Sequence, residues 1–160
     1  MSNRKGKVWK FCENRDVRAR HNFDPKKFST PFENDWLYID QTHITVKGSN
    51  GKGYAWDGCS PKVIIADMYF GTPDGRTVKQ AFEVKINGKW VLVEEYRAIT
   101  YLCSIFHDPL YQFHRELPLS RKEIDDLFLW HLEQKDFASS KLYYNVVRVG
   151  GGIYGKWKTK

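Results

Sequence analysis

The sequence predicts an α+β domain in which a small antiparallel sheet packs on an antiparallel pair of helices. Three local patterns support this prediction. Two alternating runs flank an Asn-Gly dipeptide within residues 82–93. Apolar residues recur at helical spacing over about residues 98–115. A capping motif then opens a second helical segment over about residues 120–134.

The hairpin is the clearest local feature. Residues 82–86 and 89–93 alternate between apolar and polar types on either side of Asn87-Gly88. A two-residue type I′ turn needs positive φ at both central positions, which Asn and Gly accept most readily. We therefore expect a two-residue hairpin loop at this point.

The first helix contains a proline at position 109, so we expect it either to kink there or to begin late. The second begins with the Ser120 to Glu123 pattern of a capping box. A short connector favours an antiparallel return. The inward stripe expected for the second helix comprises Ile124, Leu127, Phe128, His131 and Leu132.

The rest of the chain is organised around this core. Residues 36–46 are β-branched and aromatic, which predicts one strand. Residues 1–30 are basic and polar, Pro25 and Pro31 break any helix, and we expect an N-terminal arm. The predicted division is thus an arm over 1–30, a single domain over 31–154 and a basic tail over 155–160.

Composition narrows the class of protein. The chain of 160 residues is 41% apolar, enough for one packed core. No stretch approaches the roughly 18 to 20 apolar residues of a membrane span, and the charged N-terminus does not resemble a signal peptide. The three cysteines form no C-x-x-C motif, so we expect neither a disulfide framework nor structural zinc.

The net charge of +7 is concentrated at the two ends. Residues 1–27 carry nine Lys and Arg against three acidic residues. Such an end can hold nucleic acid or an acidic partner, or it can be a solvated tail. The candidate contacts are Arg4, Lys5, Lys7, Arg18 and Arg20.

Potential chemistry is concentrated on the helix pair. His107, Tyr111 and His114 follow at i, i+4 and i+7, so they share one helix face. Asp125 falls near the start of the returning helix, where it can reach His107. A histidine held by a carboxylate is an oriented general base.

The adjacent Asp108 could bind a hard cation such as Ca²⁺, with Asp57 and backbone oxygens of the glycine-rich loop 53–58 completing the shell. The alternative is purely structural. His107, Asp108 and Asp125 would then form a buried polar clasp between the helices, because buried polar groups need partners.

Three motifs follow one another along the chain: Gly53-Tyr54-Ala55-Trp56-Asp57-Gly58-Cys59-Ser60-Pro61, Phe106-His107-Asp108-Pro109-Leu110-Tyr111 and Ile124-Asp125-Asp126-Leu127-Phe128. Their combination and order resemble the phage and prophage family called domain of unknown function 1353. The resemblance covers roughly residues 50–150, with Cys59 where the family usually has alanine. It implies a phage-encoded protein with a phage or host protein as partner, located in the host cytoplasm or the virion. It also makes Trp56, Gly58 and Ser60 candidate site residues.

The helix pair also resembles the core of secretory phospholipase A2 and of the parvovirus capsid phospholipase. That resemblance implies that His107 is the base, Asp108 the calcium ligand and Asp125 the orienting acid. The glycine-rich loop does not match the calcium loop of those enzymes closely.

Three functions remain open from the sequence. The first is a phage protein with a structural or host-interaction role built around this site. The second is a calcium-assisted hydrolase of esters or amides. The third is an accessory protein whose basic termini hold nucleic acid. No cofactor is certain, and Ca²⁺ is the one ion that the pattern suggests.

Overall fold

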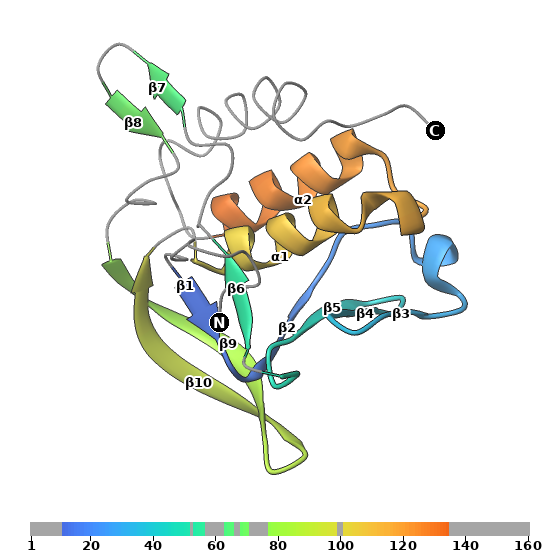
Figure 1. Cartoon of the computed structure of the whole chain (residues 1–160), viewed down its shortest axis with the longest axis horizontal. Helices are drawn as coiled ribbons and strands as arrows, with labels where there is room; N and C mark the ends of the chain where they lie inside the picture. Colours follow the sequence, from blue (N-terminus) through green and yellow to red (C-terminus); the bar gives the residue numbers. More distant parts are fainter. Residues whose placement is uncertain are drawn as a thin grey trace. The chain divides into compact units, whose positions relative to one another are not determined.

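The computed structural model describes residues 11–51, 53–56, 63–65, 68–70, 77–98 and 101–134. The chain divides into two compact units. A sheet unit comprises residues 1–57 and 79–96, and a helix unit comprises residues 58–78 and 97–160. The predicted α+β class is confirmed, because a mostly antiparallel sheet and two α-helices make up the main elements (Figure 1).

The sheet unit is built around six strands. Val17, Val46 and Val84 lie side by side on three adjacent strands and are fully buried, so they form the centre of this core. In spatial order the strands are β10 (Lys89–Ala98), β9 (Thr77–Ile86), β2 (Asp16–Arg20), β5 (His43–Lys47), β4 (Leu37–Ile39) and β3 (Phe32–Glu33).

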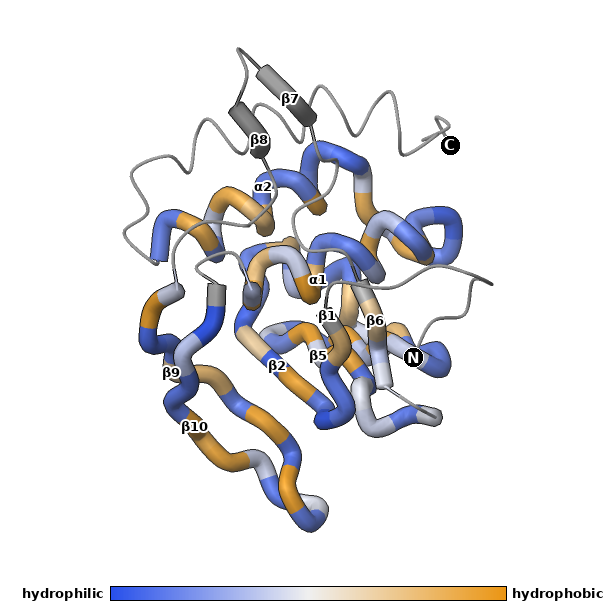
Figure 2. The backbone as a smooth tube through the Cα atoms, turned by 60° about the vertical axis from the view of Figure 1, so that its left-hand side comes forward, coloured by the Kyte–Doolittle hydropathy of each residue, from blue (hydrophilic) through white to orange (hydrophobic). Residues whose placement is uncertain are grey.

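The predicted hairpin is confirmed, and its strands are longer than residues 82–93. Both turn residues have positive φ, 52° at Asn87 and 78° at Gly88, as a type I′ turn requires. Apolar and polar residues alternate along the second half of β9, whereas β10 contains an apolar run over residues 90–93 (Figure 2). On β9 the side chains of Gln80, Phe82 and Val84 are buried, so one face of this strand belongs to the core.

The prediction of one strand over residues 36–46 is wrong, because the chain turns between β4 and β5. The Asp40 carboxylate accepts hydrogen bonds from the backbone N–H of Thr42 at 2.9 Å and of His43 at 2.7 Å. Burial alone would raise the pKa of Asp40, but these bonds outweigh it and lower that pKa. An aspartate that bonds the backbone two and three residues onward makes a turn, which the β-branched pattern did not reveal.

The predicted N-terminal arm is also wrong for much of its length. β2 lies inside the six-stranded sheet, and β1 (Phe11–Glu13) pairs with β6 (Tyr54–Trp56). A short 3-10 helix, Pro25–Phe28, follows and buries Phe28. A few apolar residues, spaced widely among charged ones, therefore fix residues 16–28 in the core. Residues 1–10 lie outside the described part.

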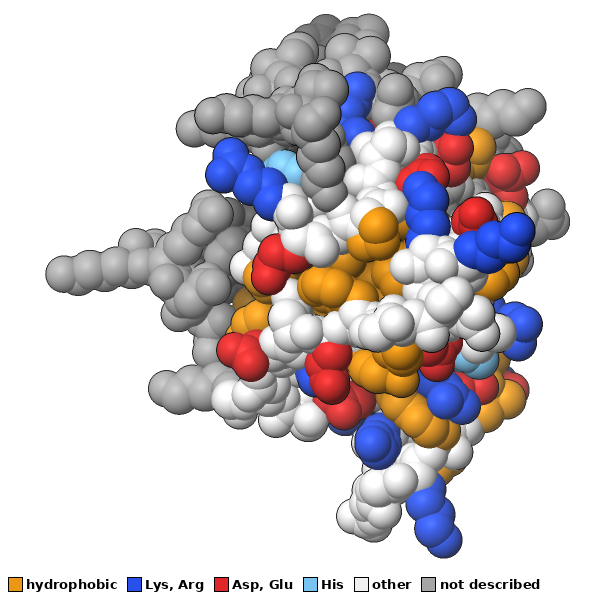
Figure 3. Space-filling view, turned by 90° about the vertical axis from the view of Figure 1, so that its right-hand side faces the viewer, with side chains coloured by type: hydrophobic (Ala, Val, Ile, Leu, Met, Phe, Trp, Pro, Cys, Tyr) orange, Lys and Arg blue, Asp and Glu red, His pale blue; other side chains and the backbone are white. Residues whose placement is uncertain are grey.

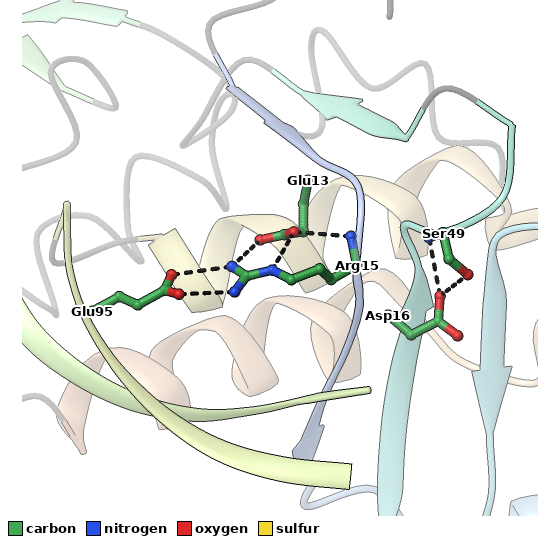
Figure 4. Close-up of polar contacts among 5 residues, drawn as sticks. All are labelled: Glu13, Arg15, Asp16, Ser49 and Glu95. Carbon is green, nitrogen blue, oxygen red and sulfur yellow. Dashed lines mark hydrogen bonds and ion pairs between the residues drawn. The ribbon is translucent and has the colours of Figure 1, made fainter. Parts of the chain in front are cut away.

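An ion-pair cluster joins β1, β10 and the turn before β2 (Figure 4). The Arg15 guanidinium donates to both carboxylate oxygens of Glu13 at 2.9 Å, and to those of Glu95 at 2.8 and 3.0 Å. Hydrogen bonds from Glu13 and Glu95 raise the pKa of Arg15. Because Glu13 is buried, this arginine provides the compensating charge that its carboxylate needs.

The described residues of the helix unit form two short strands, two α-helices and a 3-10 turn between the helices. α1 and α2 lie side by side and run in opposite directions (Figure 1), as predicted. The elements are β7 (Val63–Ile65), β8 (Met68–Phe70), α1 (Tyr101–Gln112), η2 (His114–Glu116) and α2 (Arg121–Glu133).

The bounds of the second helix were predicted well and those of the first less so. Ser120 caps α2, and Glu123 closes a complete capping box, as expected. By contrast, Ala98 belongs to β10, and the helical pattern beyond Gln112 continues as a 3-10 turn. Pro109 lies inside α1 without ending it. The expected inward stripe of α2 is buried throughout.

Candidate functional site

The site is a histidine and an aspartate on neighbouring helices. His107 Nε2 lies 2.8 Å from Asp125 Oδ1, and the two side chains are 1% and 0% exposed. His107 is the seventh of the twelve residues of α1, and Asp125 is the fifth of the thirteen residues of α2. The antiparallel arrangement therefore brings together two residues 18 positions apart, as the sequence predicted.

A second donor defines the chemistry of this carboxylate. The Tyr111 hydroxyl, one turn after His107, also donates to Asp125 Oδ1, at 2.5 Å. Burial raises the pKa of Tyr111, and the nearby Asp125 charge and its hydrogen bond raise it further. Tyr111 therefore keeps its proton and acts as a donor. An ionised carboxylate only accepts, so Asp125 accepts one hydrogen bond from Tyr111 and one from His107.

This arrangement selects the tautomer of His107. If Nε2 carries the hydrogen that Asp125 accepts, the neutral imidazole has a bare lone pair at Nδ1. That Nδ1 atom is buried and has no hydrogen-bond partner in the part of the chain that the structure describes. A buried nitrogen without a protein partner is unusual, and both a bound water and a catalytic role account for such atoms in native proteins.

Aromatic rings hold the imidazole in place. The Tyr111 ring centroid is 4.3 Å from that of His107, and the Phe128 centroid is 5.0 Å away. The ring is thus packed on both helices as well as hydrogen-bonded. Such packing fixes the ring orientation that a general base needs before substrate arrives.

Sequence reasoning missed Arg121. Its Nη1 lies 3.8 Å from Asp125 Oδ2, whereas His107 and Tyr111 contact Oδ1 of the same carboxylate. The two residues are at i and i+4 on α2, a spacing that the sequence already contained.

His114 was expected on the same face as His107, but it lies in the 3-10 turn after α1. Its Nδ1 donates to the backbone carbonyl of Tyr111 at 2.8 Å, and the side chain is buried. This ring therefore helps to close the end of the first helix. It makes no described hydrogen bond to Asp125.

The suggested cation site lies partly within the described residues and partly outside them. Asp108 is half-buried on α1, one position after His107. Among the described residues, no group of three or more His, Cys, Asp or Glu side chains could hold a metal ion. Asp57, Gly58 and Ser60 lie outside the described residues, so their place in the candidate site remains a prediction.

The suggested calcium loop over 53–58 needs a correction. Its residues Tyr54–Trp56 form strand β6, and their register with β1 pairs Tyr54 with Glu13 and Trp56 with Phe11. Backbone groups used in strand pairing are less available to an ion than those of an open loop. The glycines of this segment suggested an open loop in the sequence. Gly53 is instead required by close packing, since a Cβ there would lie 2.8 Å from the Glu13 carbonyl oxygen.

Of the basic residues suggested as nucleic-acid or partner contacts, two lie in the described part of the chain. Arg18 forms an ion pair with Glu83, and its guanidinium lies 4.4 Å from the Trp90 ring centroid. Arg20 is exposed at the end of β2. Arg4, Lys5 and Lys7 lie outside the described part. On the face drawn in Figure 3, basic and acidic side chains are mixed and do not form a field of one sign.

Comparisons of the chain with family models, curated proteins and solved structures find no match. The resemblances to the phage family and to phospholipase A2 therefore remain predictions from the motifs. None of the helices in the described ranges is both long and apolar enough to cross a membrane.

Proposed function

We propose that this protein is a hydrolase of esters or amides in which His107 is the general base and Asp125 orients it. One observation carries the proposal: Nε2 of His107 is fixed by Asp125, whereas the buried Nδ1 has no described partner. A clasp built for stability alone would satisfy both ring nitrogens, because a buried unpaired polar atom costs about 1–3 kcal/mol.

In the proposed reaction, Nδ1 of His107 takes a proton from water as the oxygen attacks the carbonyl carbon of the substrate. Asp125 stabilises the imidazolium that forms, through the hydrogen bond to Nε2. The proton then passes from Nδ1 to the alcohol or amine that leaves as its bond to the carbonyl carbon breaks. Asp108, next to His107, is the residue that would bind Ca²⁺ if the reaction uses a cation to polarise the carbonyl.

A second candidate function is a phage protein with a structural or host-interaction role, acting in the host cytoplasm or in the virion. The near-complete burial of His107 and Asp125 favours it. In this role the pair would tie α1 to α2, and a phage or host protein would bind elsewhere on the surface. The two candidates differ in whether Nδ1 can react with a molecule from solution.

Alkylation by a small α-bromoketone distinguishes them without knowledge of the substrate. We expect the reagent to modify Nδ1 of His107, located by peptide mass spectrometry, and the Asp125→Asn variant to react more slowly. His43, a half-buried histidine of the sheet unit, serves as the internal reference for ordinary reactivity. A His107 that stays unmodified while His43 reacts would exclude the hydrolase and leave the clasp.

Turnover is the second measurement. Fluorogenic acyl esters, acyl amides and phospholipid vesicles should be tested with Ca²⁺ and with a chelator. For any substrate that is cleaved, we expect His107→Gln to lower kcat by about 10²- to 10⁴-fold, which is the usual contribution of a general base. The matched control His43→Gln should leave kcat unchanged. Equal rates for the His107 variant and the wild type would contradict the proposed role.

A further inference from the structure

Exposed apolar side chains are concentrated on one hairpin. Among the described residues, every large apolar side chain that is exposed lies on β9 or β10: Ile86 at 42%, Val91 at 40%, Leu92 at 67% and Tyr96 at 71%. Leu92 and Tyr96 lie on one face of β10 and Val91 on the other, so this strand exposes apolar side chains on both of its faces.

β10 is also the last strand in the spatial order of the six-stranded sheet. It is ten residues long and contains no proline. Natural edge strands are usually short or interrupted, because an exposed edge pairs readily with another strand. A long, uninterrupted edge strand with apolar side chains is therefore suited to pairing with a strand from another molecule.

The two-residue turn determines which backbone groups face this free edge. In such a hairpin the residues flanking the loop, Ile86 and Lys89, exchange hydrogen bonds, and the pattern then alternates. The Lys85 ammonium lies 5.8 Å from the Trp90 ring, as expected for the next pair along. The backbone N–H and C=O groups that point away from β9, toward the free edge, are therefore those of Trp90, Leu92, Glu94 and Tyr96.

We propose that β10 pairs with β10 of a second copy of this chain, antiparallel and centred on Leu92. A twofold axis at that position places Leu92 opposite its own copy and Val91 opposite Val93. It also places Lys89 of each copy opposite Glu95 of the other, where the ammonium adds a second cation to a carboxylate that already accepts from Arg15. This self-complementary pattern of charge and apolar contact is why the partner is a second copy.

Other registers are less favourable. An axis at Val93 places Lys89 opposite Arg97 and Val91 opposite Glu95, which sets like charges together and carboxylates against apolar groups. An axis at Glu94 places that carboxylate opposite itself. Like charges directly opposite each other destabilise strand pairing. The position of the charges thus selects the register centred on Leu92.

The mass of the full chain in solution, measured by light scattering over a range of concentrations, tests the proposal. We expect a dimer in equilibrium with monomer. Leu92→Lys places two ammonium groups against each other at the axis and should raise the dimer dissociation constant by at least about tenfold. The control Ile86→Lys removes a comparable exposed side chain from β9 and should leave the constant unchanged.

A proline variant keeps the test valid if the lysine variant does not fold. Leu92→Pro removes an N–H that points to the free edge, so the monomer should fold with an unchanged far-ultraviolet circular dichroism spectrum and fail to dimerise. Val93→Pro removes an N–H bonded to β9 and should disturb the hairpin itself. A wild-type chain that is monomeric at all concentrations would overturn the proposal, as would a dimer that survives both Leu92 variants.

Discussion

At Asp125 Oδ1, a single carboxylate oxygen accepts hydrogen bonds from two side chains of the facing helix. His107 and Tyr111 are four residues apart on α1, so both can reach the same point. Because Tyr111 donates to Oδ1, that oxygen is a hydrogen-bond acceptor. His107 must therefore carry its hydrogen on Nε2 in order to donate to it. The reactive atom of the proposed base is therefore determined by a tyrosine that does not itself react.

Loss of His107 should destabilise the helix unit even though the proposed role is catalytic. We expect His107→Ala to lower the free energy of unfolding by about 1–3 kcal/mol, because Asp125 stays buried with one donor fewer. Urea denaturation measures this change. The control Asp126→Ala breaks only the solvent-exposed pair with Lys122 and should cost less than about 1 kcal/mol. An unchanged unfolding midpoint for the His107 variant would contradict the buried pair.

His21 in the sheet unit should make stability depend on pH. Burial lowers the pKa of His21, and its Nδ1 accepts from the Phe23 N–H, which only the neutral ring can do. The hydrogen bond from Nε2 to the Asp40 carbonyl opposes this shift. Arg20 and His43 lower the pKa further, and the charge of Asp40 opposes them.

The sign follows from the lowered pKa. The unfolded chain takes up the proton near pH 6.5, before the folded chain does, so acid favours unfolding. The contribution of neutral His21 is complete above about pH 6.5 and is lost as the pH falls toward the folded pKa. We expect His21→Gln to weaken the fall in urea midpoint between about pH 7.5 and about pH 5.5. A variant with the same acid dependence as the wild type would contradict this assignment.

At the scale of elements, two local signals predicted the structure, whereas one long-range pairing and one local turn were missed. The Asn87-Gly88 turn and the Ser120 capping box were predicted because each depends on a few neighbouring residues. β2 was missed because its place in the sheet depends on pairing with β5 and β9, both distant in sequence. The turn at Asp40 was missed because one aspartate side chain outweighs the strand preference of its neighbours.

The capping box of α2 gives a test at this scale. Ser120 Oγ accepts from the Glu123 N–H at 3.1 Å, and the Glu123 carboxylate accepts from the Ser120 N–H at 2.9 Å. We expect Ser120→Ala to lower the free energy of unfolding by about 1 kcal/mol, as for other lost caps. Ser120→Asp should retain most of the stability. If the alanine variant is as stable as the wild type in urea denaturation, the cap does not stabilise α2.

A glycine after β5 gives a second test. A Cβ at Gly48 would lie 2.2 Å from the Arg15 carbonyl oxygen and 2.6 Å from that of Glu13. Backbone must therefore move to admit any side chain, and we expect Gly48→Ala to destabilise the sheet unit strongly. Gly51→Ala is the matched control, because φ is +56° there but no atom lies within 4 Å of the new Cβ. It should cost only about 1–2 kcal/mol. Equal losses in thermal denaturation would contradict the close approach.

At the scale of the whole molecule, the folded chain redistributes the charge that the sequence separates. Basic residues near the N-terminus face acidic residues far along the chain, as Arg15 faces Glu95 and Arg18 faces Glu83. Counting charge by segment could not foresee these pairs, because strand pairing creates them. The His107 and Asp125 pair could be foreseen, because a short connector between two helices leaves little choice of geometry.

The protonation of His107 tests the central claim most directly. Long-range ¹H–¹⁵N correlation spectra at neutral pH distinguish protonated from unprotonated ring nitrogens, and the His107→Gln variant assigns the signals. We predict that Nε2 of His107 is protonated and Nδ1 is not, and that Tyr111→Phe weakens this preference. A spectrum in which Nδ1 of His107 carries the proton would contradict the account, because no base would then be available.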